Sequence, residues 1–420
     1  MKRSIIIILI FITLIICSRE LSGGTLAINK LLNIALKNNP NLNSLKSEYL
    51  SKEKEVRPAS FPPDPVVSFS LMNVPVDTFS FDRTPMSSKQ IAVQQMIPWP
   101  VKLALRGSIA SMVADVQKDM YLTTKEKLLL EVRLKYYEIV KLTRKIGIEK
   151  EKLEQVTLFE KIAQTKYKVG KGLQQDILKA KVNKAQVEMK LIVLKTQNES
   201  MIDELTRLLG IESIDPLGLE FSYDKLSNPS YAEILNKARN SFPGVKLVKS
   251  QYERSKKELT LAKWNLFPDL VFGAAYSIRD NNLSDGGVDF YTLSFGLVVP
   301  LYFPFKQAPL IQAKSRMREA SRLSVKDMDD HITTQVKVHY KLYKQSEEVI
   351  KLLEESILPE AKLSLDSSLQ SYQVDKVDFL NVLQSLITLY NYYYEMEEAQ
   401  VELYRHNAHL MYYAGGENEK

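Results

Sequence analysis

Two histidines near the end of the chain have a spacing that suits metal binding. His406 and His409 are three residues apart in a segment predicted to be helical, so both side chains would lie on one face. Imidazole nitrogens placed in this way could hold a divalent cation. No carboxylate or cysteine completes the set at the right spacing. We therefore predict packed histidines and no metal site.

Beyond these histidines, the sequence contains no pattern of catalytic residues. It has no nucleophile with its base, no glycine-rich phosphate loop and no pair of carboxylates that would flank a cleft. Tyrosines crowd the segment around the two histidines, which is typical of helix packing: Tyr390, Tyr392, Tyr393, Tyr394 and Tyr404. We predict that the protein is not an enzyme and binds no cofactor.

The charged residues are balanced and interleaved. The chain of 420 residues has 57 Lys and Arg against 50 Asp and Glu, a net charge of +7. Because basic and acidic residues alternate along predicted helices, they indicate a solvated helical face and not the basic patch of a nucleic-acid-binding protein. The charge pattern therefore argues against nucleic acid as a partner.

The first residues have the pattern of an export signal. A basic start precedes an apolar run from Ile5 to Ile16, and the polar segment SRELSGG follows. The run is too short to span a bilayer as a helix, so we predict a signal peptide at residues 1–22. Cys17, the only cysteine, leaves two alternatives. It is either a lipid attachment site, which the bulky Ile16 disfavours, or a residue lost with the signal peptide.

The chain also contains an internal duplication. YKVGKGLQQDIL, from Tyr167, aligns without gaps on YQVDKVDFLNVL, from Tyr372, 205 residues later. Three further pairs align at nearly the same offset: FPPDP with FPDL, QMIPWPVK with VVPLYFPFK, and EVRLKYY with QVKVHYK. The offset is far longer than the period of a solenoid. We predict repeats at 23–210 and 229–415, joined by a linker at 211–228 and followed by a tail at 416–420.

Each repeat ends in two helices joined by a turn. Residues 102–169 contain no proline and have apolar residues at helical spacing, which predicts one helix of about 100 Å. A returning helix is predicted at 173–209, closed by Gly210. The second repeat predicts a helix over 312–373, interrupted near Pro359, and a last helix over 379–413.

Segments of alternating polarity precede each long helix. Four predicted strands place apolar residues on one face and small or polar residues on the other: 66–72, 89–97, 270–278 and 290–299. Such runs are typical of transmembrane β-strands, and the alternative is a pair of amphipathic hairpins packed on a soluble core. Four strands cannot close a barrel, and lipid does not tolerate open sheet edges, so several chains must pool their strands.

These features resemble the TolC-type outer-membrane efflux family over essentially the whole chain after the signal peptide. The resemblance rests on the duplicated order of helix, β-hairpin, long helix, turn and helix. It also rests on the turn motifs YKVG at Tyr167 and YQVD at Tyr372, which DIL at Asp176 and NVL at Asn381 follow. The segments PDP and QMIPWP of the first hairpin resemble the heavy-metal efflux branch in particular.

The resemblance implies a fold that is mainly α with a membrane β-barrel part. Three chains would form a homotrimer whose pooled strands make a 12-stranded barrel above an α-helical periplasmic tunnel. It implies a place in the outer membrane of a Gram-negative-type cell, in contact with lipid. The implied partners are a periplasmic adaptor and an inner-membrane efflux pump. The implied function is passive conduction of metal ions, drugs or other small molecules to the exterior.

The resemblance also implies a channel gate in the second repeat. Family members place aspartates near the periplasmic mouth, where this chain has Asn381 and Gln384. A ring of carboxylates would bind cations, whereas a ring of amides cannot titrate. Asp375 and Asp378 are nearby and would supply such a ring one turn closer to the tip. The alternative is that both are exposed carboxylates of the turn.

The two turns are the expected contact with the adaptor. The residues predicted to make this contact are Lys168, Gly170, Lys171, Gly172, Asp375 and Lys376. The alternative is that they are only solvated side chains. Asp375 stands where the family has a glycine, which predicts a looser or differently capped second turn.

Two other classes of function are weighed against a channel. A non-transporting envelope scaffold built on a long coiled coil would account for the helices, but not for strands with small residues on one face. A soluble exported enzyme lacks a pocket signature and gives no reason for helices of about 100 Å.

Overall fold

The computed structural model describes residues 28–213, 230–282 and 286–416. The predicted signal peptide, most of the predicted linker and all but the first residue of the predicted tail fall outside these ranges. The described residues form two compact units. The first takes its residues from within 1–43, 124–242 and 331–420, and the second from within 44–123 and 243–330. Each unit thus contains parts of both predicted repeats.

The helices that lead to the strands are broken at the same place in both repeats. α2 (Ile28–Asn38) is followed by α3 (Pro40–Ala59), and α6 (Tyr231–Ser241) by α7 (Pro243–Trp264). A proline opens the second helix of each pair, where its missing N–H has no intrahelical partner to lose. Asn39 caps α3, because its side-chain oxygen accepts a hydrogen bond from Leu42 N at 3.0 Å.

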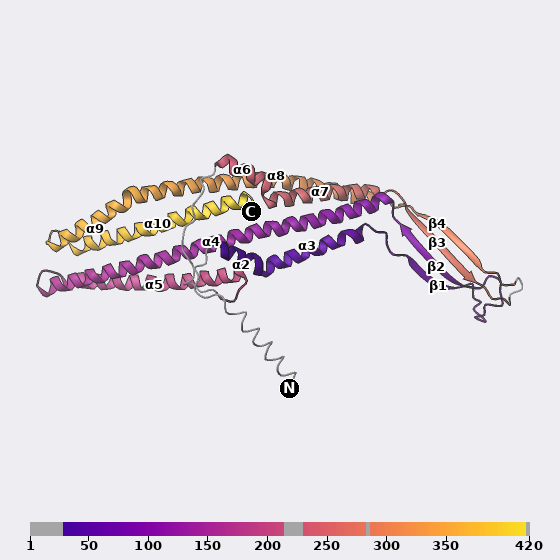
Figure 1. The fold of residues 1–420 in the computed structure, drawn as a ribbon, viewed down its shortest axis with the longest axis horizontal. Coiled ribbons are helices and arrows are strands. Elements are labelled where there is room, and N and C mark those ends of the chain that lie inside the picture. The colour runs from indigo at the N-terminus through magenta and orange to yellow at the C-terminus, as the bar shows by residue number, and fades with distance from the viewer. Residues whose placement is uncertain (1–27, 214–229, 283–285, 417–420) are drawn as a thin grey trace, which may run out of the picture. The chain divides into compact units, whose positions relative to one another are not determined.

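The long helix of the first repeat is unbroken. α4 (Pro100–Lys168) has 69 residues, which confirms the helix predicted over 102–169, and Gly147 lies within it (Figure 1). α5 (Gln174–Leu209) returns and ends at Gly210, whose φ of 66° is the left-handed conformation typical of a helix C-terminus. Only glycine fits here, because a Cβ would lie 2.6 Å from Asn38 O.

The corresponding helix of the second repeat is interrupted where Pro359 predicted a break. α8 (Gln307–Leu352) passes into one π-helical turn (Leu353–Ile357), and α9 (Leu358–Gln373) follows. Proline lacks the N–H for an α-helical bond and its ring crowds the carbonyl four residues back, so a wider turn directly before it relieves the clash. α8 begins at Gln307, five residues before the predicted start. α10 (Phe379–Tyr413) has the predicted bounds.

The strands of the described residues form one antiparallel sheet of four, in the order β1 (Val66–Met72), β2 (Ser88–Ile97), β3 (Asp269–Ile278) and β4 (Phe290–Val298). All four lie within one residue of their predicted bounds. β2 pairs with β3, so the central pair of the sheet joins one hairpin from each repeat.

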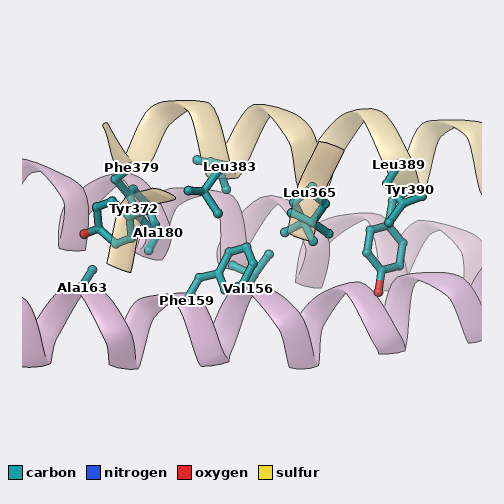
Figure 2. Packing of buried hydrophobic residues seen from close by; sticks show 12 residues of the cluster. Val156, Phe159, Ala163, Ala180, Leu365, Tyr372, Phe379, Leu383, Leu389 and Tyr390 are labelled. Carbon is teal, nitrogen blue, oxygen red and sulfur yellow. The ribbon is translucent and has the colours of Figure 1, made fainter. Parts of the chain in front are cut away.

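One hydrophobic cluster of the first unit lies between the helices near the two turns. Side chains from α4, α5, α9 and α10 meet there, among them Phe159, Ala180, Leu365, Tyr372 and Phe379 (Figure 2). Small residues such as Ala163 and Ala180 let the helices approach closely, and aromatic rings fill the remaining space.

In the described ranges, the helices lack an apolar stretch of the length that a bilayer crossing requires.

Candidate functional site

The turns of the two helical hairpins, which we call the tips, share one backbone conformation. Gly170 and Asp375, 205 residues apart, both have positive φ, 74° and 62° respectively. Lys171 N donates to Lys166 O at 2.9 Å, and Lys376 N donates to Ser371 O at 2.8 Å. These are equivalent bonds of a Schellman-type helix ending. The expectation of a looser or differently capped second turn is therefore wrong, because Asp375 adopts the conformation of the glycine it replaces.

Asp375 obtains a partner that the sequence did not predict. Its carboxylate accepts a hydrogen bond from Lys166 Nζ, which also donates to Tyr372 O. Lys166 lies 4.3 Å over the Tyr372 ring, so one ammonium group joins the end of α4 to the second tip. The hydrogen bond from Lys166 holds the pKa of Asp375 below its usual value.

The four predicted gate residues have different surroundings. Asp375 points to Lys166, and Asp378 is the exposed residue before α10, whose side chain makes no capping hydrogen bond. Asn381 and Gln384 instead line one shallow groove between α9 and α10. Uncharged polar side chains make up most of the rest of its lining: Ser364, Ser368, Ser385 and Thr388. The two amides thus share this groove, and Asp375 and Asp378 precede them at the second tip and at the start of α10.

The predicted adaptor residues all lie at the tips. Lys168, Gly170, Lys171, Asp375 and Lys376 are exposed, and Gly172 is half-buried. Exposed apolar side chains accompany them, and these were missed in the sequence: Val169, Leu173 and Val374. Their position next to the turn glycines, or next to the aspartate that replaces one, is the sequence feature that could have predicted their exposure.

The two tips differ in one tyrosine. Tyr167 of the first tip is 47% exposed, whereas its counterpart Tyr372 is 5% exposed and packs against Phe379 with the ring centroids 5.5 Å apart. Burial raises the pKa of Tyr372 to about 12. The tips are therefore alike in backbone but offer different surfaces.

The sheet has one apolar and one small or polar face, as the alternation predicted. The register places Phe69, Ile91, Tyr276 and Tyr291 side by side on the apolar face. Leu293 and Phe295 share that face, since alternate residues of a strand point the same way. The opposite face carries Ser68, Ser70, Ala92, Gly273, Thr292 and Ser294. The apolar face is open, because Phe69, Leu293 and Phe295 are 66%, 85% and 63% exposed.

A buried ion pair fixes the junction of strands and helices. Lys102, at the start of α4, donates to Asp269 Oδ1 at 2.8 Å and to Phe267 O at 2.7 Å, and its side chain is 3% exposed. Trp99 N donates to the same carboxylate oxygen at 3.1 Å. The strand exit of the first repeat is thereby bound to the strand entry of the second.

A buried carboxylate connects α4, α5 and α10. Glu149 is 0% exposed, and its Oε1 accepts a hydrogen bond from Tyr394 O–H at 2.7 Å. Lys190 Nζ lies 3.5 Å from the same oxygen and 4.1 Å from the Tyr394 ring centroid. This network could not be predicted from the sequence, because its partners on α4 and α10 are 245 residues apart.

The histidines predicted to be simply packed have a third partner. His339 of α8 places its Nδ1 3.2 Å from His406 Nδ1 and stacks on His409 at 4.1 Å. Burial lowers the pKa of His339 and of His409 to about 4. Glu402, one turn before His406, lies with its carboxylate 3.6 Å from His406 Nε2.

Solved structures with this arrangement of helices and strands come from outer-membrane proteins. VceC of Vibrio cholerae, an outer membrane protein, superposes with a TM-score of 0.79 at 15% identity, over 93% of this chain and 96% of VceC. CusC, which folds into a transmembrane channel, has a TM-score of 0.77 at 13% identity, over 95% of this chain and 96% of CusC. The outer membrane channel MtrE of Neisseria gonorrhoeae, in its open state, has a TM-score of 0.76 at 13% identity, over 93% of this chain and 89% of MtrE.

This chain has the fold of outer-membrane channels. The match covers nearly the whole of each chain, including the helical hairpins and the sheet. It confirms at the level of fold the TolC-type resemblance drawn from the duplicated sequence. No protein-family model and no curated protein matches the sequence.

Proposed function

We propose that the protein is the outer-membrane channel component of a tripartite efflux system and conducts small solutes passively. The open apolar face of the sheet is the observation that carries this proposal. Large side chains such as Phe69, Leu293 and Phe295 are left exposed on it by a single chain. A contiguous apolar surface of this kind indicates a membrane or a partner. Small and polar residues on the other face suit a water-filled lumen.

The edges of the sheet argue for assembly. β1 and β4 are the outermost strands of the sheet in the described residues, so each leaves one edge without a neighbour. Unpaired backbone groups are not tolerated in lipid, and the sheet must therefore close with strands from other chains. Three copies give the 12-stranded barrel that we propose, with a lumen wide enough for solutes.

An unpartnered helix face supports the same assembly. Leu178, Val182, Met189 and Val193 recur at helical spacing along α5 and are exposed. We propose that a second copy of the chain covers this helix face, because the open sheet edges already require further copies. Packing of this face against that copy would continue the oligomer from the barrel into the helical region.

We further propose that the tips contact a periplasmic adaptor and, through it, an inner-membrane pump. Two tips per chain would give six similar contacts in a trimer. The tips are alike in backbone, but the buried Tyr372 and the exposed Tyr167 make the two sets of contacts different in strength. Asn381 and Gln384 would line the closed end of the tunnel as an uncharged ring. Asp375, held by Lys166, and Asp378 would lie nearer the tip.

A pair of substitutions at Gly170 tests the adaptor contact. Because φ is 74°, any side chain at this position strains the turn, while a Cβ there meets no atom within 4 Å. Gly170→Ala carries the strain alone and Gly170→Trp carries strain and bulk. We expect Trp to abolish export with trimers intact, and Ala to retain export. Normal export with Trp, or equal loss with Ala, would place the adaptor contact elsewhere.

The channel itself is tested by reconstitution. We expect the protein, purified in mild detergent, to contain three chains per particle and to give single-channel conductance in planar bilayers. The cargo would follow the specificity of the pump. A monomer without conductance would favour the alternative function, a non-transporting envelope scaffold.

A further inference from the structure

All four histidines of the chain lie on α8 and α10. His331 and His339 come from α8, His406 and His409 from α10, and all four are in the same compact unit. Three of them are in contact, although His339 is 67 residues from His406 in the sequence. Neither passive conduction nor the tips make use of this cluster.

The spacing of two ring nitrogens is that of ligands on one ion. His339 Nδ1 and His406 Nδ1 are 3.2 Å apart. Two imidazoles bound to a tetrahedral ion at about 2.0–2.1 Å would place their nitrogens about 3.3–3.4 Å apart. The nitrogens are therefore already at the separation of two ligands, and the rings need to turn so that both point at a common ion. Without an ion, one Nδ1–H donates to the other Nδ1.

Neighbouring groups hold both rings in place. His409 stacks on His339 with an angle of 7° between the ring planes, which fixes the plane of that imidazole. Glu402 Oε2 lies 3.6 Å from His406 Nε2, the nitrogen that faces away from His339. A carboxylate near the remote nitrogen favours the Nε2–H tautomer and leaves the Nδ1 lone pair for an ion. The His406 side chain is 14% exposed, so it is not sealed from water.

We propose that His339 and His406 form an inter-helix binding site for a divalent transition-metal ion such as Zn²⁺ or Cu²⁺. Within the described ranges, no three His, Cys, Asp or Glu side chains already surround a common point. The proposed site therefore has two protein ligands, and water molecules fill the other positions. On binding, the imidazole that carried its proton on Nδ1 takes the Nε2–H tautomer, so both ligands stay neutral. The ion would link α8 to α10.

Metal titration of the full chain, purified without a polyhistidine tag, tests the site. We expect calorimetry to show one Zn²⁺ per chain, and His339→Gln and His406→Gln each to weaken binding at least about tenfold. Glu402→Gln should weaken it by about tenfold, as expected for an outer-shell carboxylate. His331→Gln is the matched control, since eight residues along α8 put His331 about 12 Å from His339.

A spectroscopic measurement keeps the test independent of the variants. Cu²⁺ added to the unmodified chain should give an electron paramagnetic resonance spectrum with coupling to two imidazole nitrogens. Absence of Zn²⁺ binding, a Cu²⁺ spectrum without nitrogen coupling, or affinities unchanged in both His339→Gln and His406→Gln would overturn the proposal.

Discussion

At the scale of single residues, Asp375 combines an unfavourable backbone with a favourable charge contact. A φ of 62° is sterically costly for an aspartate by about 1–3 kcal/mol, although Asn and Asp tolerate it best. The side chain accepts a hydrogen bond from Lys166, which ties the second tip to α4. Gly170, the equivalent residue of the first tip, has the same conformation without this contact. The turn conformation of the second tip is therefore supported by an ion pair, whereas that of the first tip is possible because glycine has no side chain.

This ion pair should make the second tip sensitive to acid. The pKa of Asp375 is lower in the folded protein than the usual value of about 3.9, so its contribution is present above that pH and lost as the pH falls through the folded pKa. We expect the Lys376 amide to lose hydrogen-exchange protection relative to the Lys171 amide below about pH 4. In Asp375→Asn, the ratio of hydrogen-exchange protection at the Lys376 amide to that at the Lys171 amide should not change with pH. A constant ratio in the unmodified protein would mean that the pair contributes nothing.

At the scale of elements, the sheet and the helices are joined by a charge pair whose lysine is buried and whose aspartate is mostly buried. Lys102 has two protein acceptors, and Asp269 also accepts from the backbone of Trp99. Removing one partner of such a pair leaves a buried charge without compensation. The junction is thus held by polar bonds at the point where proline-rich segments end both helix and strand.

The substitution Lys102→Met should therefore destabilise the junction. We expect a loss of about 3–5 kcal/mol in the free energy of unfolding, measured by denaturant titration of the detergent-solubilised protein. Lys52→Met is the matched control, because Lys52 pairs with Glu55 at 2.9 Å on an exposed helix surface. That change should cost about 0–1 kcal/mol. Equal losses in the two variants would contradict the role given to the buried pair.

The two faces of β4 should respond differently to charge. Phe295 lies on the apolar face and Ser294 on the small and polar one. An arginine that faces lipid near mid-membrane costs about 2–4 kcal/mol, whereas one in the lumen costs far less. We expect Phe295→Arg to reduce the yield of trimers in membranes and Ser294→Arg to leave assembly intact with lower conductance. Equal assembly of the two variants would contradict the orientation of the sheet.

At the scale of the whole molecule, local patterns predicted the elements and missed the contacts between them. The strand at 290–298 and the helix at 379–413 follow from periodicity, which depends only on neighbours in the sequence. Lys166 and Asp375 are 209 residues apart, so their pairing depends on which helix faces meet. His339 was missed for the same reason. The second turn was mispredicted because Asp375 tolerates a conformation that composition assigns to glycine.

We expect one face of this sheet to meet lipid and the other a water-filled lumen. Nitroxide labels placed one at a time at residues 291–297 of the reconstituted protein test it directly. Accessibility to oxygen, which concentrates in lipid, and to a water-soluble nickel chelate is measured at each position by electron paramagnetic resonance. We predict opposite oscillations of period two, with oxygen favoured at Tyr291, Leu293, Phe295 and Leu297. Uniform access of the nickel chelate along the whole segment would contradict the claim.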